Sequence, residues 1–220
     1  MQNKKNSKPN TEERKRQLLD VALEQFALNG YHKTKVSDVV READVSQGTF
    51  YWYFQSKEEA ALDVINEGKQ KVLAVIEQGY RREEAAVEEM AASTTNLFYD
   101  LFTFADDNRH LMILLFIKGY GADLAIRKAV AETYKAIEEA FRRNLERAME
   151  LELLPKQTEP EVQAALITNM ITGTISRWLF GPNLDINYQS HITAEKMARY
   201  AAEFEFYGIA GAWSKGEKKG

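Results

Sequence analysis

The distribution of proline is the feature that most constrains the fold of this chain. The four prolines stand at positions 9, 155, 160 and 182, so none interrupts residues 10–154. Proline breaks helices because its ring crowds the preceding turn and its nitrogen carries no N–H donor. Apolar residues in this stretch recur at helical spacing, and they do not alternate with polar residues over a convincing length. The sequence therefore predicts an all-α fold.

The first helix shows this periodicity clearly. Leu18, Ala22 and Phe26 share one face, and Thr11 or the residue before it can cap the start. Gly30 follows this face and can adopt the left-handed conformation that ends helices. Further helices are expected at about 36–43, 47–54, 56–80, 85–105, 107–118, 122–151, 160–181 and 193–213, which makes about nine in all.

Residues 36–54 have the layout of a helix-turn-helix, whose second helix enters the major groove of DNA. Ser46 is a suitable N-cap for the second helix. Val45 and Phe50 flank its start as a hydrophobic staple, so both are expected to face inward. Residues 47–49 are then left facing outward, at the end where a recognition helix meets base edges and phosphates.

The outward residues of this helix suit DNA contact. Gln47 can pair with adenine, and the methyl group of Thr49 can contact thymine. Gly48 costs helix stability, which is understandable where backbone must approach DNA closely.

Four successive aromatic residues, 51–54, follow, and they cannot all be buried on one helix. Phe54 shares the inward face with Phe50. Tyr51, Trp52 and Tyr53 must then point at least partly outward, where their hydroxyl and indole groups can donate to phosphates. The alternative for Trp52 is packing on a neighbouring helix, and the sequence favours neither.

A capping box opens the next helix, with Ser56 as the cap and Glu59 reaching back. Lys57 lies in the first turn, where the helix dipole disfavours a cation unless a phosphate is near. Alternatively, Lys57 is a solvated lysine offset by its acidic neighbours. The lysines at positions 4, 5 and 8 could add phosphate contacts, although a disordered tail without a role in binding is the simpler interpretation.

These residues resemble the signature of the tetracycline-repressor (TetR) family of regulators. Residues 45–59, VSQGTFYWYFQSKEE, match the family pattern, and positions between Phe26 and Val39 agree with it. There are two departures. Lys35 replaces the usual Ser or Thr cap of the second helix, so Thr34 is expected to cap instead, and Tyr53 stands where His is frequent. By resemblance, the DNA-contacting residues are Thr34, Ser46, Gln47, Gly48, Thr49, Tyr51, Trp52, Tyr53 and Lys57.

The resemblance also implies a three-helix DNA-binding head on a larger helical body that dimerises and binds a small ligand. We expect a disordered basic arm at 1–10, the helix-turn-helix domain at 11–55, a ligand-binding and dimerisation domain at 56–213 that begins with a linking helix at 56–80, and a disordered tail at 214–220. Residues 1–60 hold 10 basic and 9 acidic side chains, whereas the remainder holds 19 and 24. The acidity is thus concentrated in the body, away from the DNA.

The body must supply a dimer interface and an effector site. Small residues on the helices at 160–181 and 193–213 allow close approach, so these helices could pair with a second copy, or the same faces could pack within one chain. An apolar effector, such as an acyl chain, an aromatic compound or a drug, would need few polar anchors, for which Asn169, Thr172 and Arg177 are candidates. Aromatic candidates for lining the site, most of which suit a core role better, are Phe98, Phe102, Phe116, Tyr120, Tyr134 and Trp178.

We predict that the protein is a dimeric, ligand-responsive repressor. It binds double-stranded operator DNA and leaves the DNA when an apolar or amphipathic effector binds. Activation stays open, because it depends on where the operator lies. The alternatives are an enzyme, or a helical small-molecule-binding protein, without DNA activity. His32, His110 and His191 are dispersed, and no phosphate-binding loop, nucleophile elbow or zinc-protease motif is present. No catalytic residue, metal ligand or cofactor is therefore predicted.

The composition of the chain limits the class of DNA-binding protein and the cellular compartment that we expect. A net charge of -4 excludes a uniformly basic protein that coats DNA. The lack of cysteine fits the reducing cytoplasm. The longest apolar run, residues 111–117, is far shorter than the roughly 20 residues that span a bilayer, so no membrane partner is expected.

Overall fold

The computed structural model describes residues 11–79, 87–154 and 159–214, and within these ranges it is built from helices without strands. This confirms the predicted all-α fold. The helices are α1 (Thr11–Asn29), α2 (Val36–Glu42), α3 (Gln47–Tyr53), α4 (Lys57–Gln78), α5 (Val87–Asp107), α6 (Arg109–Ile113), α7 (Leu124–Glu150), α8 (Pro160–Phe180) and α9 (Ala194–Ser214). The predicted arm at 1–10 and all but Ser214 of the predicted tail lie outside the described residues.

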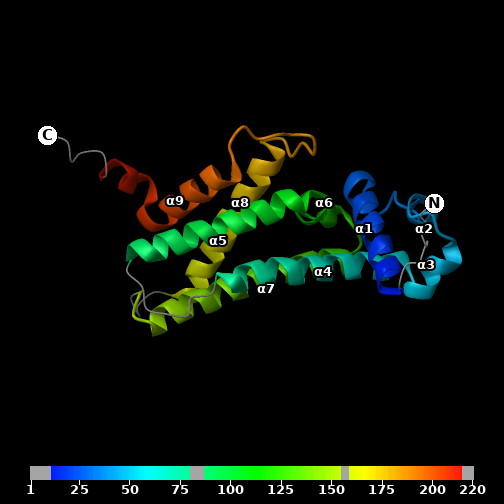
Figure 1. Cartoon of the computed structure of the whole chain (residues 1–220), viewed down its shortest axis with the longest axis horizontal. Helices are drawn as coiled ribbons and strands as arrows, with labels where there is room; N and C mark the ends of the chain where they lie inside the picture. Colours follow the sequence, from blue (N-terminus) through cyan, green and yellow to red (C-terminus); the bar gives the residue numbers. More distant parts are fainter. Residues whose placement is uncertain (1–10, 80–86, 155–158, 215–220) are drawn as a thin grey trace, which may run out of the picture.

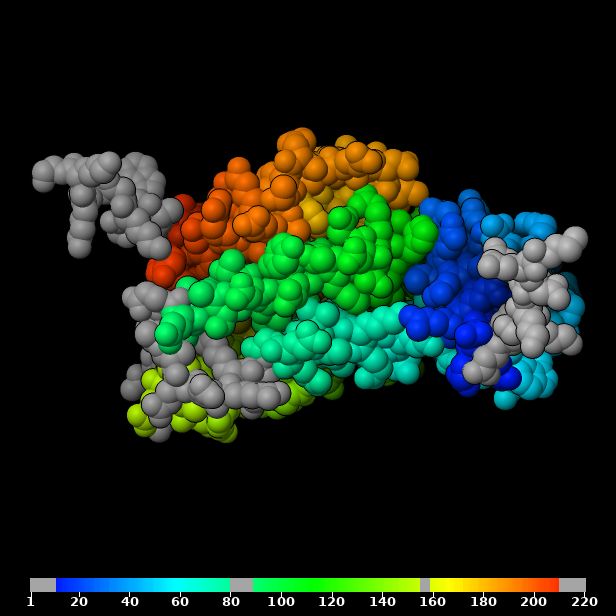
Figure 2. Space-filling view, in the orientation of Figure 1, coloured from blue at the N-terminus to red at the C-terminus, as the bar shows by residue number. Residues whose placement is uncertain are grey.

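The helices form a small head at one end of an elongated body. Helices α1, α2 and α3 make up the head, and α4 leads from it along the body (Figure 1). In the body α4 packs on α7, α5 packs on α9 and α7 packs on α8. Helices α4 and α5 lie as adjacent bands on one face of the molecule (Figure 2). None of the described helices is long and apolar enough to cross a membrane.

A continuous hydrophobic core joins the head to the body. Phe26, Phe50 and Phe54 fill the centre of the head, and the buried side chains of α4, among them Ile65, continue the same cluster into the body. Gly30 ends α1 with a φ of 83°, in the left-handed region, as the sequence predicts. The burial of apolar surface thus stabilises the packing of the head against the first turns of α4.

The start of α2 differs from the prediction. Lys35 is the N-cap residue, and its backbone N–H donates to the Asp38 carboxylate at 3.0 Å. This hydrogen bond, together with Arg41, lowers the pKa of Asp38 below its usual value. Thr34 does not cap α2, because its hydroxyl donates instead to the carbonyl oxygens of Gln25 and Gly30, each at 3.0 Å. The expected Thr34 cap was wrong.

The single helix predicted at 107–118 is broken. Helix α6 ends at Ile113, and a π-helical turn, η1 (Leu114–Lys118), and a short 3-10 turn, η2 (Gly119–Gly121), lead to α7. A Cβ atom on Gly119 would lie 2.7 Å from the Leu114 carbonyl oxygen and 2.8 Å from Val130 Cγ2. The turn therefore needs glycine at this position. Both α6 and η1 pack on α1, so this irregular segment joins the body to the head.

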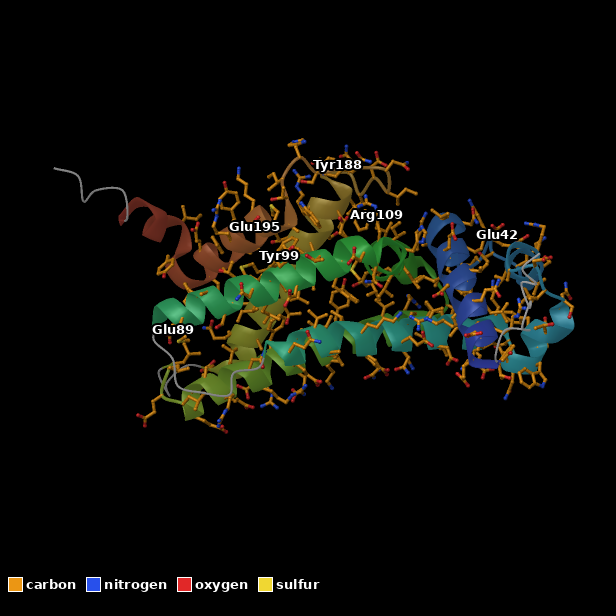
Figure 3. The ribbon with its side chains drawn as sticks, viewed as in Figure 1. Glu42, Glu89, Tyr99, Arg109, Tyr188 and Glu195 are labelled. Carbon is orange, nitrogen blue, oxygen red and sulfur yellow. The ribbon has the colours of Figure 1, made fainter. Side chains whose placement is uncertain are left out.

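The loop between α8 and α9 is fastened to the start of α6. Arg109 Nη2 lies within hydrogen-bond distance of the carbonyl oxygens of Leu179, Ile186 and Tyr188, at 2.7, 3.2 and 2.7 Å (Figure 3). The Arg109 guanidinium also lies over the Phe180 ring, 5.1 Å from its centroid. A charged donor that bonds several carbonyls holds this loop firmly against the body.

Candidate nucleic-acid interface and effector cavity

Helix α3 begins with the cap that the sequence predicts. Ser46 Oγ accepts a hydrogen bond from the Thr49 N–H at 3.1 Å and lies 3.0 Å from Thr49 Oγ1. Gln47 and Gly48 are exposed beside it. A Cβ on Gly48 would meet only Ser46 Oγ, at 3.6 Å, so nothing inside the described part of the head requires glycine there.

The aromatic residues of α3 divide between an inner and an outer face. Phe50 and Phe54 are buried, whereas the exposed fractions of Tyr51 and Trp52 are 54% and 68%. Tyr53 is half-buried, and its ring meets that of Trp52 edge-on at 4.5 Å. Trp52 therefore does not pack into a neighbouring helix, the alternative that the sequence left open. An exposed indole next to the exposed start of α3 is a surface suited to a partner.

Two residues from the predicted DNA-contact set point into the head instead. The side chain of Thr34 is only 1% exposed, and the carbonyls of Gln25 and Gly30 occupy its hydroxyl, so it cannot reach DNA in this conformation. Lys57 Nζ donates to the carbonyl oxygens of Tyr31 and Thr34, at 2.7 and 2.9 Å. Burial lowers the pKa of Lys57. Two of its three N–H donors are thus used within the head.

Two basic residues that the sequence reading did not select are exposed at the start of α2. Lys33 lies in the turn between α1 and α2, and Lys35 is the last residue before α2. Lys35 was interpreted only as a departure from the family cap, although a basic residue beside the first helix of a helix-turn-helix is well placed for a phosphate. The position of these two lysines directly before the first helix of the helix-turn-helix is the sequence feature that indicates a phosphate contact.

The body contains a cavity of about 280 Å³ at the end away from the head. The end of α4, the start of α5 and the later turns of α7 form its walls, with α8 and α9 completing it. Its polar lining residues are Ser93, Thr94, Asn144, Gln163 and Glu205, and its apolar lining includes Leu97, Phe98, Phe141, Leu145 and Ile167. We call this the outer cavity. It combines apolar walls with a few polar groups, as small-molecule sites commonly do.

A second cavity of about 40 Å³ lies in the middle of the body. We call it the inner chamber. It is lined almost entirely by apolar side chains from α4, α5, α6, η1, α7 and α8, among them Ile76, Ala105, Phe116, Phe141 and Ile171. Thr133 and Thr172 are its only hydroxyl-bearing lining residues besides Tyr134 among those that the structure describes.

The six predicted lining residues have different positions. Phe98 lines the outer cavity, and Phe116 and Tyr134 line the inner chamber. Burial and the contact with Tyr120 raise the pKa of the Tyr134 phenol above its ordinary range, so it stays protonated. Tyr120 itself is mostly exposed.

Phe102 and Trp178 are buried and line neither the outer cavity nor the inner chamber. Their rings pack edge-on at 5.3 Å, and Trp178 Nε1 donates to the Ile192 carbonyl at 2.7 Å. Of the predicted polar anchors, Thr172 lines the inner chamber, whereas Asn169 and Arg177 are exposed on the outside of α8. The prediction of anchors was wrong for those two, because the face of α8 that carries them points away from the body.

The outer faces of α8 and α9 carry exposed apolar side chains. Val162 and Leu166 on α8, and Tyr200 and Phe204 on α9, are each about half exposed or more. The small residues that suggested close approach include Ala164, which is buried within the chain. Gly173, another of these small residues, is exposed, so the outer face of α8 carries both small and large apolar residues.

Comparison with known proteins agrees with this architecture. Residues 18–64 match the family described as bacterial regulatory proteins, tetR family, and residues 94–200 match the C-terminal region of MAATS-type transcriptional repressors. The fatty acid metabolism regulator protein of Bacillus subtilis is 23% identical over 163 residues, which cover 74% of this chain and 82% of that protein. The regulator AcrR of Shigella flexneri is 24% identical over 184 residues, covering 80% and 83%.

Solved structures share the fold. The transcriptional regulator FadR of Bacillus subtilis superposes with a TM-score of 0.72 at 21% identity, over 88% of this chain and 98% of that chain. FadR of Bacillus halodurans superposes with a TM-score of 0.75 at 18% identity, over 92% and 98%. The matches to both the head and the body show that the chain belongs to the TetR family of bacterial regulatory proteins and that it is a DNA-binding transcription regulator.

Proposed function

We propose that this regulator is a cytoplasmic homodimeric repressor that binds an operator through its two heads and leaves it when an amphipathic effector with a long acyl chain binds in the body. The exposed Tyr51 and Trp52 beside the exposed start of α3 carry the proposal for DNA. More than half of each side chain is exposed, and the Tyr51 hydroxyl and the Trp52 indole N–H can donate hydrogen bonds to phosphate oxygens.

The contacts with DNA divide into base-reading and phosphate-binding groups. Gln47, Gly48 and Thr49 present side chains and backbone to base edges, with Ser46 holding the start of the helix. The phosphates are bound by the Tyr51 hydroxyl, the Trp52 indole and the edge of Tyr53. Lys33 and Lys35 add exposed positive charge at the start of α2.

Dimerisation uses the exposed apolar faces of α8 and α9. Exposed apolar side chains on helices that pack together are typical of an interaction site, and a symmetric copy would bury Val162, Leu166, Tyr200 and Phe204. A dimer also explains how one operator is read, because two recognition helices must enter the major groove about 34 Å apart, or a multiple of that.

The effector is a long-chain acyl thioester. The FadR structure from Bacillus subtilis contains stearoyl-CoA, and the outer cavity and inner chamber of this chain offer a polar entrance and an apolar interior. Hydroxyl and amide side chains line the outer cavity and almost only apolar side chains line the inner chamber, so the two together suit a molecule with a polar group and a long alkyl chain.

Release follows from a shift between two conformations. In one conformation the spacing of the two heads matches the operator, and in the other it does not. An effector that binds the second conformation more tightly shifts the dimer toward it, and only this difference in affinity drives release from DNA. Helix α4 begins directly after the head and ends next to Gly79, which lines the outer cavity. A tilt of α4 therefore changes the spacing of the two heads.

The DNA-binding surface is tested by Tyr51→Ala, with Tyr99→Ala as the matched control. Both tyrosines are about half exposed, 54% and 44%, but Tyr99 lies on α5 in the body (Figure 3). A duplex selected by this protein from random sequences serves as the operator, and binding is measured by fluorescence anisotropy. We expect Tyr51→Ala to weaken binding by about tenfold or more, whereas Tyr99→Ala leaves it unchanged, with equal melting temperatures. Equal affinities for the two variants would place the DNA surface elsewhere.

A further inference from the structure

The outer cavity and the inner chamber are consecutive parts of one space between the same helices. On α5 the outer cavity ends at Phe98 and the inner chamber begins at Leu101. On α8 the corresponding residues are Ile167 and Ile171. Each gap is about one helical turn, roughly 5.4 Å of helix axis. Only a thin layer of side chains therefore separates the two cavities.

Phe141 forms the centre of that layer. It is the one described residue that lines both cavities, and its side chain is buried. Its side chain therefore stands between the outer cavity and the inner chamber on α7. Side-chain rotation about two torsions is enough to move a phenylalanine ring, provided that a ligand occupies the space it leaves.

The combined space is long and changes chemistry along its length. On α7 it extends from Ala148 in the outer cavity to Thr133 in the inner chamber, a span of about 22 Å along the helix axis. Hydroxyl, amide and carboxylate groups line the outer part, and almost only hydrocarbon lines the inner part. A molecule with a polar head and a long extended alkyl chain fits this gradient.

We propose that Phe141 is a partition that makes this regulator sensitive to the length of its effector. An acyl thioester whose chain ends in the outer cavity binds without moving Phe141. A longer chain displaces the Phe141 ring and enters the inner chamber. The proposal rests on the proposed function, because it specifies which members of that effector class cause release.

The inner chamber is the part of the space that can signal to the head. Leu115 and Phe116 of η1 and Met112 of α6 form its wall, and both elements pack on α1. A chain that enlarges the inner chamber therefore pushes on the segment that supports the head. The outer cavity is lined by none of the residues of α6 or η1 that the structure describes. A short chain accordingly occupies the site without causing release.

The test uses one matched pair of substitutions, Ala105→Leu and Ala148→Leu. Both alanines are buried, and they line the inner chamber and the outer cavity respectively. Binding of octanoyl-, dodecanoyl- and stearoyl-CoA to the intact protein is measured by isothermal titration calorimetry. Release from the selected duplex is measured by anisotropy.

We expect Ala105→Leu to weaken stearoyl-CoA by about tenfold, the effect of excluding about two methylenes from an apolar site, and to leave octanoyl-CoA unchanged. Ala148→Leu should weaken both thioesters. In the unsubstituted protein, octanoyl-CoA should bind without releasing DNA. Phe141→Leu, which keeps the core apolar and removes the ring, should tighten stearoyl-CoA more than octanoyl-CoA, because only the longer chain has to displace the ring.

Two outcomes overturn the proposal in distinguishable ways. If the three thioesters bind and release DNA, but Ala105→Leu and Phe141→Leu change their affinities equally or not at all, Phe141 is no partition and the proposed effector class stands. If none of the thioesters binds the unsubstituted protein, the effector class is wrong and the partition falls with it. Circular dichroism melting of each variant establishes that a lost affinity does not reflect unfolding.

Discussion

Two lysines of the head lie near the same turn but have different surroundings. The Lys57 ammonium donates to two carbonyl oxygens and lies 4.2 Å from the centroid of the Tyr31 ring. The Lys35 side chain is exposed at the start of α2. We therefore assign Lys57 to the internal structure of the head and Lys35 to the binding of phosphate.

Replacing each lysine by alanine separates these roles. Lys57→Ala removes the donor for the carbonyls of Tyr31 and Thr34, and we expect it to lower the free energy of unfolding by about 1–3 kcal/mol. The salt dependence of operator binding should keep its slope. Lys35→Ala should leave stability unchanged and reduce the slope of log K against log salt by about one. Urea unfolding and salt titrations measure the two effects. A reduced slope with unchanged stability in Lys57→Ala would make it a phosphate contact after all.

The sequence could predict residues whose partners are close along the chain. The Ser46 cap bonds a residue three positions away, and Gly30 ends its own helix. The roles of Thr34 and Lys57 depend on partners from other elements, since Lys57 bonds carbonyls 23 and 26 positions earlier. Such pairs exist only after α4 has packed on the head, so a reading of local patterns could not find them.

At the scale of helices, the break after α6 shows where periodicity stops being informative. Residues 111–117 are all apolar, so no face distinguishes one helical register from another. A π-helical turn adds one residue to a turn without changing the composition. The other helices expected in the body have a polar face, and their predicted ends differ from the observed ones by only about two residues.

The proposed dimer face is tested by Leu166→Glu, with Leu124→Glu as the control. The two leucines are equally exposed, at 59% and 57%, but Leu124 lies at the start of α7. A carboxylate buried without a partner in an apolar interface is strongly unfavourable, so Leu166→Glu should yield monomers. Analytical ultracentrifugation should find Leu124→Glu dimeric. A dimeric Leu166→Glu protein with unchanged affinity between copies would place the interface on another face.

At the scale of the whole molecule, the proposed DNA surface on α3 and the outer cavity lie at opposite ends of the molecule, and α4 runs between them (Figure 1). Helix α4 has 22 residues, about 33 Å, and packs on α1 near its start and on α5 and α7 further along. The segment from α6 to η1 gives a second connection to α1. Two routes through packed helices allow the sites to influence each other without direct contact.

The influence between the sites must be reciprocal. If stearoyl-CoA weakens operator binding by some factor, saturating operator DNA must weaken stearoyl-CoA binding by the same factor, which for coupled sites is typically about 5–150-fold. Calorimetric titration of stearoyl-CoA into the protein with and without the selected duplex, together with anisotropy titrations of the duplex with and without stearoyl-CoA, gives both factors. Tyr51→Ala is the control, because it should bind stearoyl-CoA normally and should show a smaller effect of the duplex at a concentration that does not saturate this weakened variant. Stearoyl-CoA affinities that are equal for free and DNA-bound protein would mean that the two ends are not coupled, and that release requires a different effector.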